Sequence, residues 1–390
     1  MKIMTILGTR PEIIRLSLVI KLLDQHADHI LVHTGQNYDD RLNGLFFREL
    51  EIRKPDVFLG VRGDGFAHQV GEILSKSHPL LLQHRPDRLL ILGDTNSGLT
   101  ALVARRLGIP VYHMEAGNRC YDDRVPEEIN RRVIDHSSSV LMPYTNRSRE
   151  NLIKEGFENG RVFVVGNPIG EVLAHYAGRI AASTALADHG VQSRKFFLVT
   201  LHRAENVDVA DRLPILMEGL ILLQRQYGFP VICSLHPHTK AKLKAFQINP
   251  SQAGLHFVEP LGFFDFVKLE QSAFCLLSDS GTVQEEACIA GVPSVTLRDV
   301  TERPETIECG SNVLAGCDPA SILKLVDLVT RENGLWQPPM EYLAKHVAAT
   351  VCRILLGFHI PDLAEKVWLA RSHQIPLKQS DSLDVVSKSK

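Results

Sequence analysis

The sequence predicts an α/β protein built from two doubly wound domains. Short apolar runs typical of strands alternate with helical patterns, and this series ends near residue 167 and then starts again. Strand and helix in alternation favour parallel sheets with helices on both faces. A chain of 390 residues can hold two such domains, each with its own core. We expect a ligand cleft between the carboxyl ends of the two sets of strands.

The expected domains are residues 1–168 and 169–365, followed by a polar tail at 366–390. The predicted strands are 3–7, 29–33, 88–92, 110–113, 140–142 and 162–165 in the first domain, and 196–201, 231–235, 255–258, 274–277 and 294–297 in the second. Helices are predicted notably at 12–23, 66–77 and 97–107. A helical pattern at 340–356 is a candidate to cross back to the first domain.

Composition and charge exclude several classes of protein. The formal net charge is only −2, which gives no global field to attract nucleic acid or a membrane. No stretch approaches the roughly 18 consecutive apolar residues of a membrane span, and the N-terminus lacks the features of a signal peptide. Seven scattered cysteines without a CxxC pair indicate reduced thiols in a cytoplasm, with neither disulfides nor zinc. No HExxH-like spacing supports another metal site.

Three carboxylates of the first half stand where predicted strands give way to helices. Asp94 ends the buried strand in LILGDTNSG, Glu115 ends the strand in YHMEAGNR, and Glu127 follows the helix-opening Pro126. Open α/β sheets present acid and base groups to a crevice at such strand ends. Two plainer interpretations stay open, because Asp94 could cap the next helix and Glu127 could merely favour a helix N-terminus.

The first strand-to-helix turn reads GTRPEIIR from residue 8. Gly8 allows a tight turn, Arg10 can contact a phosphate or a carboxylate, and Pro11 begins the helix. The turn is neither a Walker A loop nor GxGxxG, so nucleotide triphosphate hydrolysis and dinucleotide binding both lose support. An ordinary capped turn with solvated arginines is the alternative.

The second half carries features suited to a nucleotide diphosphate. The strand in FLVTLHRAENV ends in His202, where a histidine can shuttle protons or contact phosphate, although a lone histidine is more often structural. SDSGTVQEEA, from residue 278, places a helix N-terminus after a strand, and free N–H groups there suit a diphosphate. Glu286 could accept from ribose hydroxyls, and Arg298 or Arg303 could neutralise phosphate. A capped helix with solvated acids is the plainer alternative.

Taken together, these motifs resemble the non-hydrolysing UDP-N-acetylglucosamine 2-epimerases. The motifs run in order over about residues 1–315: GTRPE at 8–12, GDT at 93–95, EAGNR at 115–119, PEEINR at 126–131, HRAEN at 202–206, SDSGTVQEEA at 278–287 and TERPE at 301–305. The resemblance implies two Rossmann-like domains of the glycosyltransferase-B type, with the active site in the cleft between them. It also implies a homodimer.

The resemblance implies inversion at C2 of a UDP-2-acetamido sugar without any cofactor. The C2 proton is removed and UDP leaves C1, then UDP adds back and C2 is reprotonated on the opposite face. The catalytic positions carried over are Asp94, Glu115, Glu127 and His202. The substrate-binding positions carried over are Arg10, Arg15, Arg131, Phe266 beside the uracil, Ser280, Gly281, Thr282, Glu286 and Arg303. Which carboxylate removes the proton and which returns it stays open.

The sequence departs from the family pattern at two places. Arg15 stands where many members carry Lys, and Arg demands a planar, forked contact. The segment GQNYDDR at 35–41 replaces the Gln-His-Arg type segment of members with a second, allosteric UDP-sugar site. We therefore predict no activation by UDP-N-acetylglucosamine. The EIIRLS run and GNRCYDDRVPEEINRR look closer to the branch that makes UDP-N-acetyl-L-fucosamine from UDP-2-acetamido-2,6-dideoxy-L-talose for capsule or O-antigen.

Three other functions compete with this interpretation. A glycosyltransferase of the same two-domain shape would need an acceptor groove but not three acids together. A hydrolysing epimerase would release the free sugar and UDP. A non-catalytic UDP-sugar-binding protein would keep the SDSGTVQEE motif and Arg303 but would have no use for the acids at 94, 115 and 127.

Overall fold

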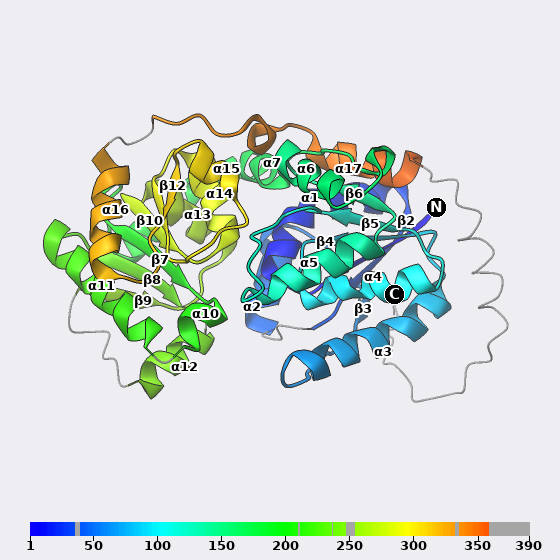
Figure 1. Ribbon diagram of the computed structural model, residues 1–390, viewed down its shortest axis with the longest axis horizontal. Coiled ribbons are helices and arrows are strands. Elements are labelled where there is room, and N and C mark those ends of the chain that lie inside the picture. The colour runs from blue at the N-terminus through cyan, green and yellow to red at the C-terminus, as the bar shows by residue number, and fades with distance from the viewer. Residues whose placement is uncertain (36–39, 210, 236, 247–253, 332–334, 359–390) are drawn as a thin grey trace. The chain divides into compact units, whose positions relative to one another are not determined.

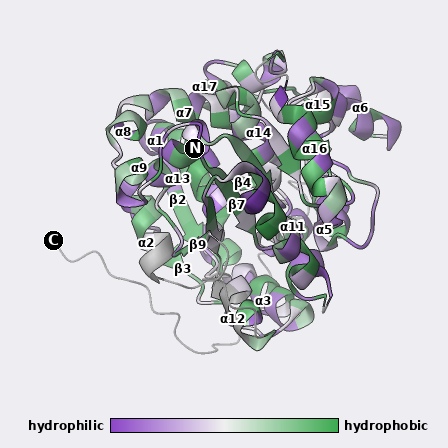
Figure 2. Ribbon diagram, turned by 90° about the vertical axis from the view of Figure 1, so that its left-hand side faces the viewer, coloured by the Kyte–Doolittle hydropathy of each residue, from purple (hydrophilic) through white to green (hydrophobic). Residues whose placement is uncertain are grey.

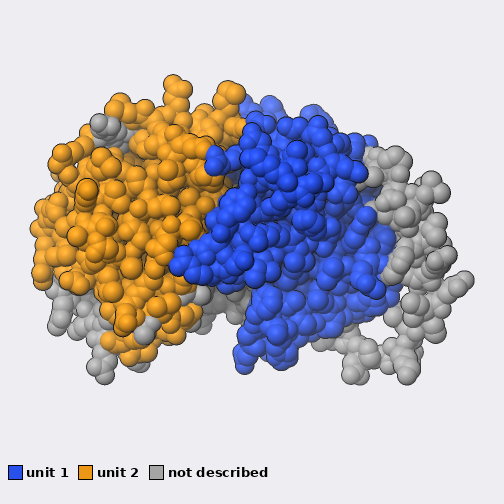
Figure 3. Space-filling view, in the orientation of Figure 1, with its two compact units in different colours: residues 1–168, 344–390 blue, residues 169–343 orange. Residues whose placement is uncertain are grey.

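The computed structural model describes residues 1–35, 40–209, 211–235, 237–246, 254–331 and 335–358. The chain forms two compact units (Figure 3). Unit 1 contains residues 1–168 together with the described residues from Ala344 onward, and unit 2 contains Ile169–Leu343. Each unit is built around its own parallel sheet, as Figure 1 shows.

The described strands of unit 1 form a parallel sheet in the order β3-β2-β1-β4-β5-β6. Its strands are β1 Lys2–Leu7, β2 Asp28–His33, β3 Val57–Phe58, β4 Arg88–Leu92, β5 Val111–Met114 and β6 Val140–Met142. Its helices are α1 Arg10–His26, α2 Asp40–Glu49, α3 Phe66–His84, η1 Asn96–Leu99, α4 Thr100–Arg106, α5 Pro126–Ser137, α6 Asn146–Lys154, η2 Asn159–Arg161 and α17 Val347–Gly357. This strand order is that of a doubly wound fold. The chain adds strands on one side of β1 up to β3, and then on the other side from β4 onward.

Alternate residues of the unit 1 strands supply the two faces of this sheet. Met4, Val32 and Ile91 pack in one buried cluster with side chains of α3, α4 and α5. Helices α1 and α17 lie on the opposite side (Figure 1). Figure 2 shows α6 largely in the colours of hydrophilic residues. Burial on both faces explains the near-continuous apolar strands.

The described strands of unit 2 repeat the same topology in the order β12-β11-β10-β7-β8-β9. Its strands are β7 Phe197–Leu201, β8 Val231–Leu235, β9 Leu255–Val258, β10 Cys275–Ser278, β11 Ser294–Thr296 and β12 Asn312–Leu314. Its helices are α7 Pro168–His175, α8 Ala177–Ala182, α9 Ala185–Asp188, α10 Ala204–Val207, α11 Arg212–Tyr227, α12 Pro237–Ala245, α13 Phe263–Ser272, α14 Gly281–Ala290, α15 Pro304–Glu308, α16 Pro319–Arg331 and η4 Met340–Leu343. Helices α11 and α16 cover one face of the sheet, and α13 and α14 cover the other (Figure 1).

The structure confirms the predicted fold class and differs from the predicted elements at the sheet edges. Strands β3 and β12 are only two and three residues long, and neither is among the predicted strands. The predicted strand at 162–165 forms only an isolated bridge from Val162 to Leu141. Its next hydrogen bond, from Val165 N–H to the carbonyl of Pro143, is 3.0 Å long, but Pro143 has no N–H to return.

The C-terminal part of the second predicted domain belongs to unit 1. The helical pattern at 340–356 is divided into η4 and α17, and His346 between them has a left-handed backbone with φ of 62°. Beyond this break, the Tyr112 hydroxyl donates to the Phe358 carbonyl at 2.7 Å, and Arg88 donates to the carbonyl of Leu355. These bonds and the packing of α17 on α1 place residues 344–358 in unit 1, the domain to which the pattern at 340–356 is a candidate to cross back. The predicted tail at 366–390 lies outside the described residues.

Candidate active site

The carboxyl edge of the unit 1 sheet gathers three turns of the chain. Strands β1, β4 and β5 are neighbours, and they lead into the turns that carry Arg10, Asp94 and Glu115 respectively. Gly93 has a φ of 73°, and a Cβ added there would lie 3.6 Å from a Glu115 carboxylate oxygen. The acid that follows β5 therefore lies against the turn that leads to Asp94.

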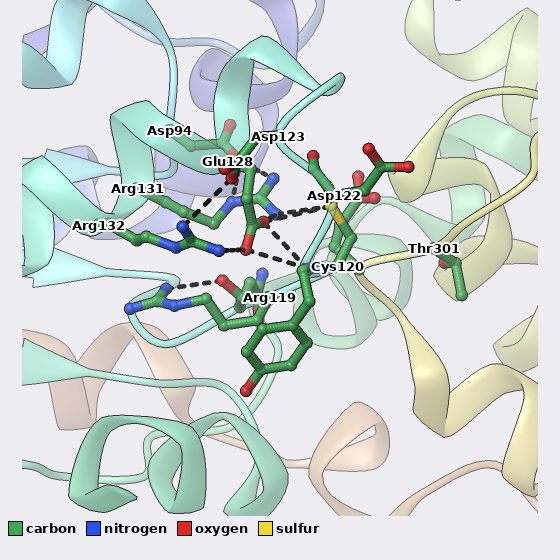
Figure 4. Close-up of polar contacts among 12 residues, drawn as sticks. Asp94, Arg119, Cys120, Asp122, Asp123, Glu128, Arg131, Arg132 and Thr301 are labelled. Atoms are coloured by element: carbon green, nitrogen blue, oxygen red, sulfur yellow. Dashed lines mark hydrogen bonds and ion pairs between the residues drawn. The ribbon is translucent and has the colours of Figure 1, made fainter. Parts of the chain in front are cut away.

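Asp94 is held by an arginine from α5. Arg131 donates from Nε and Nη2 to Asp94 Oδ2 at 3.0 and 2.5 Å, and its Nη1 donates to Glu128 at 2.6 Å (Figure 4). The N-cap of the next helix is Thr95, which removes the interpretation of Asp94 as a helix cap. The Arg131 side chain is 2% exposed and that of Asp94 is 25% exposed, so the acid is the accessible member of the pair.

Glu128 fixes the loop between β5 and α5. It is fully buried and accepts from the backbone N–H groups of Cys120 and Tyr121 at 3.0 and 3.1 Å. Arg131 and Arg132 bind the same carboxylate (Figure 4). Burial opposes ionisation, but the Cys120 N–H and the arginine charge outweigh it and hold the pKa of Glu128 below its usual range. Of the two acids that follow Pro126, this one has a structural role.

Glu127 is the second residue of α5, one turn before Arg131, and is half-buried. Residues four apart lie on the same face of a helix. Glu127 therefore lies on the helix face from which Arg131 reaches Asp94.

Glu115 lies between an arginine and an asparagine and has an unusual backbone. Arg15 Nη1 donates to one carboxylate oxygen at 3.3 Å, and Asn118 Nδ2 donates to the other at 3.2 Å. Arg15 is 1% exposed, and its guanidinium lies 5.6 Å from the centroid of the Tyr144 ring. The φ of Glu115 is 66°, in the left-handed region that side chains other than glycine avoid.

The turn that carries Arg10 is tied to the Asp94 turn by Glu12. This buried carboxylate accepts from the N–H groups of Gly8 and Thr9 at 3.0 and 2.7 Å and from the Thr95 hydroxyl at 3.2 Å. Burial raises the pKa of Glu12 to about 7, even though these hydrogen bonds oppose the shift. Burial also lowers the pKa of Arg10, whose guanidinium lies 5.9 Å from the centroid of the Phe46 ring.

The carboxyl edge of the unit 2 sheet is organised around Asp279. This residue is fully buried at the end of β10 and accepts from the N–H groups of His202 and Arg203, each at 3.0 Å. Its carboxylate also lies 3.1 Å from Nδ1 of His202, whose side chain is 43% exposed. Burial disfavours the charge, but His202 and the hydrogen bonds lower the pKa of Asp279 to about 2. His202 is thus held against a buried anion and reaches solvent.

The predicted phosphate turn has the expected local form. Ser280 is the N-cap of α14, and its hydroxyl lies 3.0 Å from that of Thr282. A Cβ on Gly281 would lie 2.9 Å from a carboxylate oxygen of Glu302. No side chain larger than hydrogen fits there without displacing that acid.

Buried acids hold the arginines of this edge. Glu302 accepts from Arg203 at 3.2 Å and from Arg298 at 2.7 Å. Arg303 donates from Nε to Glu285 at 2.5 Å. All three acid–arginine contacts lie among residues that follow β7, β10 and β11, which are neighbouring strands.

Helices α13 and α14 carry the last two predicted substrate-binding residues, Phe266 and Glu286. Phe266 packs against the buried apolar cluster beneath α13, and Glu270 follows one turn later on the same helix. Burial and the neighbouring Glu286 carboxylate raise the pKa of Glu270 well above its usual value. Two buried carboxyl groups in contact favour a shared proton, which fixes the orientation of Glu286.

The structure thus groups the predicted residues into two sets. Unit 1 holds Asp94, Glu115, Glu127, Arg10, Arg15 and Arg131, and unit 2 holds His202, Phe266, Ser280, Gly281, Thr282, Glu286 and Arg303. The buried supporting acids were not predicted, because their only signal in the sequence is an acidic residue inside or beside a motif; they are Glu12, Asp279, Glu285 and Glu302. Four residues of the GQNYDDR segment, 36–39, lie outside the described residues, and the prediction of no allosteric activation stays a prediction.

The described residues lack two features, a metal-binding cluster and a membrane-spanning helix. They contain no group of three or more His, Cys, Asp or Glu side chains arranged to hold a metal ion. Within the same described ranges, no helix combines the length and apolar character that crossing a membrane requires.

Comparison with known proteins finds extensive similarity. The sequence model of UDP-N-acetylglucosamine 2-epimerase matches residues 21–356. The UDP-N-acetylglucosamine 2-epimerase of Methanocaldococcus jannaschii is 41% identical over 347 residues, which are 87% of this chain and 95% of that protein. The UDP-2,3-diacetamido-2,3-dideoxy-D-glucuronate 2-epimerase of Pseudomonas aeruginosa is 38% identical over 81% of this chain and 88% of its own.

Solved structures agree with these sequence matches. The crystal structure of the Methanocaldococcus jannaschii enzyme in complex with UDP-GlcNAc and UDP superposes with a TM-score of 0.87 at 40% identity. The match covers 91% of this chain and 99% of that one. These similarities confirm the family resemblance that the motifs predicted.

Proposed function

We propose that this chain, which belongs to the UDP-N-acetylglucosamine 2-epimerase family, inverts C2 of a UDP-2-acetamido sugar while the sugar stays attached to UDP in substrate and product. The reaction is an elimination of UDP followed by its re-addition. The observation that carries the proposal is the arrangement at the unit 1 sheet edge, where Asp94 and Glu115 are the accessible members of pairs with buried arginines.

The chemistry needs an acid and a base at C2. In the first step a carboxylate takes the C2 proton, the C1–O bond to UDP breaks, and a C1–C2 double bond forms. In the second step UDP adds to C1 and a proton is delivered to the opposite face of C2. A carboxylate on each face meets this need by general acid–base catalysis. We assign these roles to members of the set Asp94, Glu115 and Glu127.

The leaving group is an anion, so its departure is favoured by fixed positive charge and hydrogen-bond donors. We assign UDP binding in unit 2 to Ser280, Gly281 and Thr282 at the start of α14, with the Arg303 guanidinium beside Gly281 and His202 at the end of β7. The N–H groups at a helix start suit a diphosphate. Glu286 accepts from the ribose, Phe266 lies beside the uracil, and Arg10, Arg15 and Arg131 contribute positive charge from unit 1.

Two substrates are candidates. UDP-N-acetylglucosamine is named for the relative that is 41% identical, and UDP-2-acetamido-2,6-dideoxy-L-talose is suggested by the EIIRLS and GNRCYDDRVPEEINRR segments. A relative named for a UDP-diacetamido sugar acid supports a family that accepts varied 2-acetamido sugars. We further infer a cytoplasmic homodimer that supplies a surface polysaccharide pathway, and the free cysteines support the reducing location.

The test is proton NMR in D2O with each candidate sugar nucleotide. Deuterium entering C2, together with an epimer that remains linked to UDP, is the expected result, and the sugar that reacts identifies the substrate. Release of free sugar and UDP would instead indicate the hydrolysing epimerase. Absence of exchange with both sugars would contradict the proposal, and transfer of the sugar to an added acceptor would favour the glycosyltransferase.

A further inference from the structure

Glu115 has a backbone conformation that its own sequence does not favour. Its φ of 66° is in the left-handed region, where the Cβ atom crowds the following carbonyl oxygen. Such a conformation persists only when the surrounding structure holds it. The question is which residues hold Glu115 there.

Asp135 binds the chain on both sides of Glu115. Its Oδ1 lies 2.9 Å from Nδ1 of His113, two residues before Glu115. Its Oδ2 accepts from the N–H of Gly117, two residues after, at 3.2 Å. Asp135 and His113 are both fully buried. A single carboxylate therefore spans the five-residue segment that has Glu115 at its centre.

His113 links the same network to the other acid. Its Nε2 lies 2.8 Å from the carbonyl oxygen of Gly93, the residue before Asp94. Both ring nitrogens of His113 thus lie beside oxygens, the Gly93 carbonyl and the Asp135 carboxylate. Arg119 binds the second Asp135 oxygen at 2.8 Å and continues to Glu155 at 2.5 Å.

One helix organises all three acids. Glu127, Arg131 and Asp135 are spaced four residues apart on α5 and so lie on one face. The first is itself a predicted catalytic group, the second binds Asp94, and the third binds the two flanks of Glu115.

We propose that Asp135, acting through His113 and Gly117, is a positioning residue that holds Glu115 in its left-handed conformation and so aims its carboxylate at the substrate. This inference rests on the proposed function, because it assigns a task to a carboxylate that the proposal makes catalytic. A purely structural role for Asp135 in a buried ion pair is the alternative.

The first test measures backbone strain and needs no activity. The variants Glu115→Ala and Glu115→Gly both remove the carboxylate, but only glycine adopts a positive φ at no steric cost. In the wild-type background we expect E115G to melt about 2–4 °C above E115A. In an Asp135→Asn background this gap should shrink or reverse, because residue 115 relaxes. An unchanged gap would overturn the proposal.

The second test separates turnover from binding. D135N should lower kcat for C2 proton exchange by about 100-fold, the typical effect of misplacing a catalytic group by about 1 Å, with the Kd for UDP unchanged. The matched control is Asp56→Asn. Asp56 also accepts from a backbone N–H and an arginine in unit 1, but it lies at the amino end of the outer strand β3. D56N should keep its kcat, and equal losses in the two variants would support the structural alternative.

If D135N does not fold, His113→Gln replaces it, because Gln can still reach the Gly93 carbonyl but loses the contact with Asp135. A fall in kcat with UDP affinity retained is expected, and an unchanged kcat overturns the proposal. If wild-type protein exchanges no C2 proton, the proposed function fails, while the melting comparison still decides whether Asp135 holds residue 115.

Discussion

The two sheet edges have the same topology and opposite charge arrangements. In unit 1 the buried partner is the arginine: Arg15 and Arg131 are 1% and 2% exposed, against 11% and 25% for Glu115 and Asp94. In two pairs of unit 2 the buried partner is the acid: Asp279 is 0% exposed against 43% for His202, and Glu302 is 3% against 15% for Arg203.

This difference teaches that the buried partner decides which charge an edge presents. A charge removed from water requires a partner, and that partner is then held in a defined orientation at the surface. Buried arginines in unit 1 orient carboxylates, which are suited to moving a proton. Buried acids in unit 2 orient a histidine and an arginine, which are suited to a diphosphate. Four predictions, ordered from the largest expected effect, test this division.

Removing the charge of Glu115 in unit 1 should abolish turnover but not nucleotide binding. Glu115→Gln keeps the shape of the side chain, and we expect turnover to fall by about 10²–10⁴-fold, the usual contribution of a general acid or base. Steady-state NMR assays and calorimetric UDP binding measure the two quantities. Glu72→Gln, which alters an acid of α3 paired with Lys76, is the control with normal turnover. Weaker UDP binding at normal turnover would contradict the division.

Removing the buried acid of unit 2 should change acid stability. The pKa of Asp279 is about 2 against an ordinary 3.8, because His202 and the hydrogen bonds outweigh the cost of burial. A lowered native pKa stabilises the fold above pH 3.8, and this contribution of about 2 kcal/mol is lost as the pH falls through about 2. Urea unfolding across pH 2–6 should show this loss in the wild-type protein and not in Asp279→Asn. Parallel pH curves for the two proteins would refute the assignment.

Adding a methyl group at the phosphate turn should weaken substrate binding. Gly281→Ala places a Cβ 2.9 Å from Glu302, which must move together with the arginines it binds. We expect KM to rise about 10-fold with a smaller change in kcat, since ground-state and transition-state binding are lost together. Gly178→Ala in α8, where a Cβ meets nothing within 4 Å, is the matched control. A kcat effect without a KM effect would assign Gly281 to the chemistry instead.

Exchanging one cation for another in unit 1 should have the smallest effect. Arg15→Lys keeps the charge beside Glu115 but loses the planar group above Tyr144. We expect a loss of about 0.5–1 kcal/mol of stability, the usual size of a cation–π contact, and a turnover within about fivefold of wild type, because the charge is retained. Thermal unfolding and the NMR assay measure both. A loss as large as that of Glu115→Gln would mean that the fork geometry, and not the charge, is essential.

Local patterns in the sequence predicted most of the fold. Apolar runs bounded by glycine and proline predicted the central strands of both sheets, because strands buried on both faces are apolar throughout. The two-residue β3 and the three-residue β12 escaped because they are only partly buried, whereas the short strands β6 and β11 are buried throughout. The break at His346 also escaped, because nothing in the local sequence requires a left-handed residue there. The return of α17 to unit 1 depends on packing against α1, a contact more than 300 residues away in the chain.

The sequence by itself determined the topology class, the family and the turns that carry candidate catalytic groups, because these are properties of neighbouring residues. Only the tertiary structure decided which charges are buried. Glu127 and Glu128 are adjacent and identical in chemistry, yet one is a half-buried candidate for catalysis and the other anchors a loop from inside the protein. Asp135 and Asp279 look like ordinary acids until the fold brings His113 and His202 to them. Burial and charge pairing depend on residues that are far apart in the chain, and therefore no local pattern predicts them.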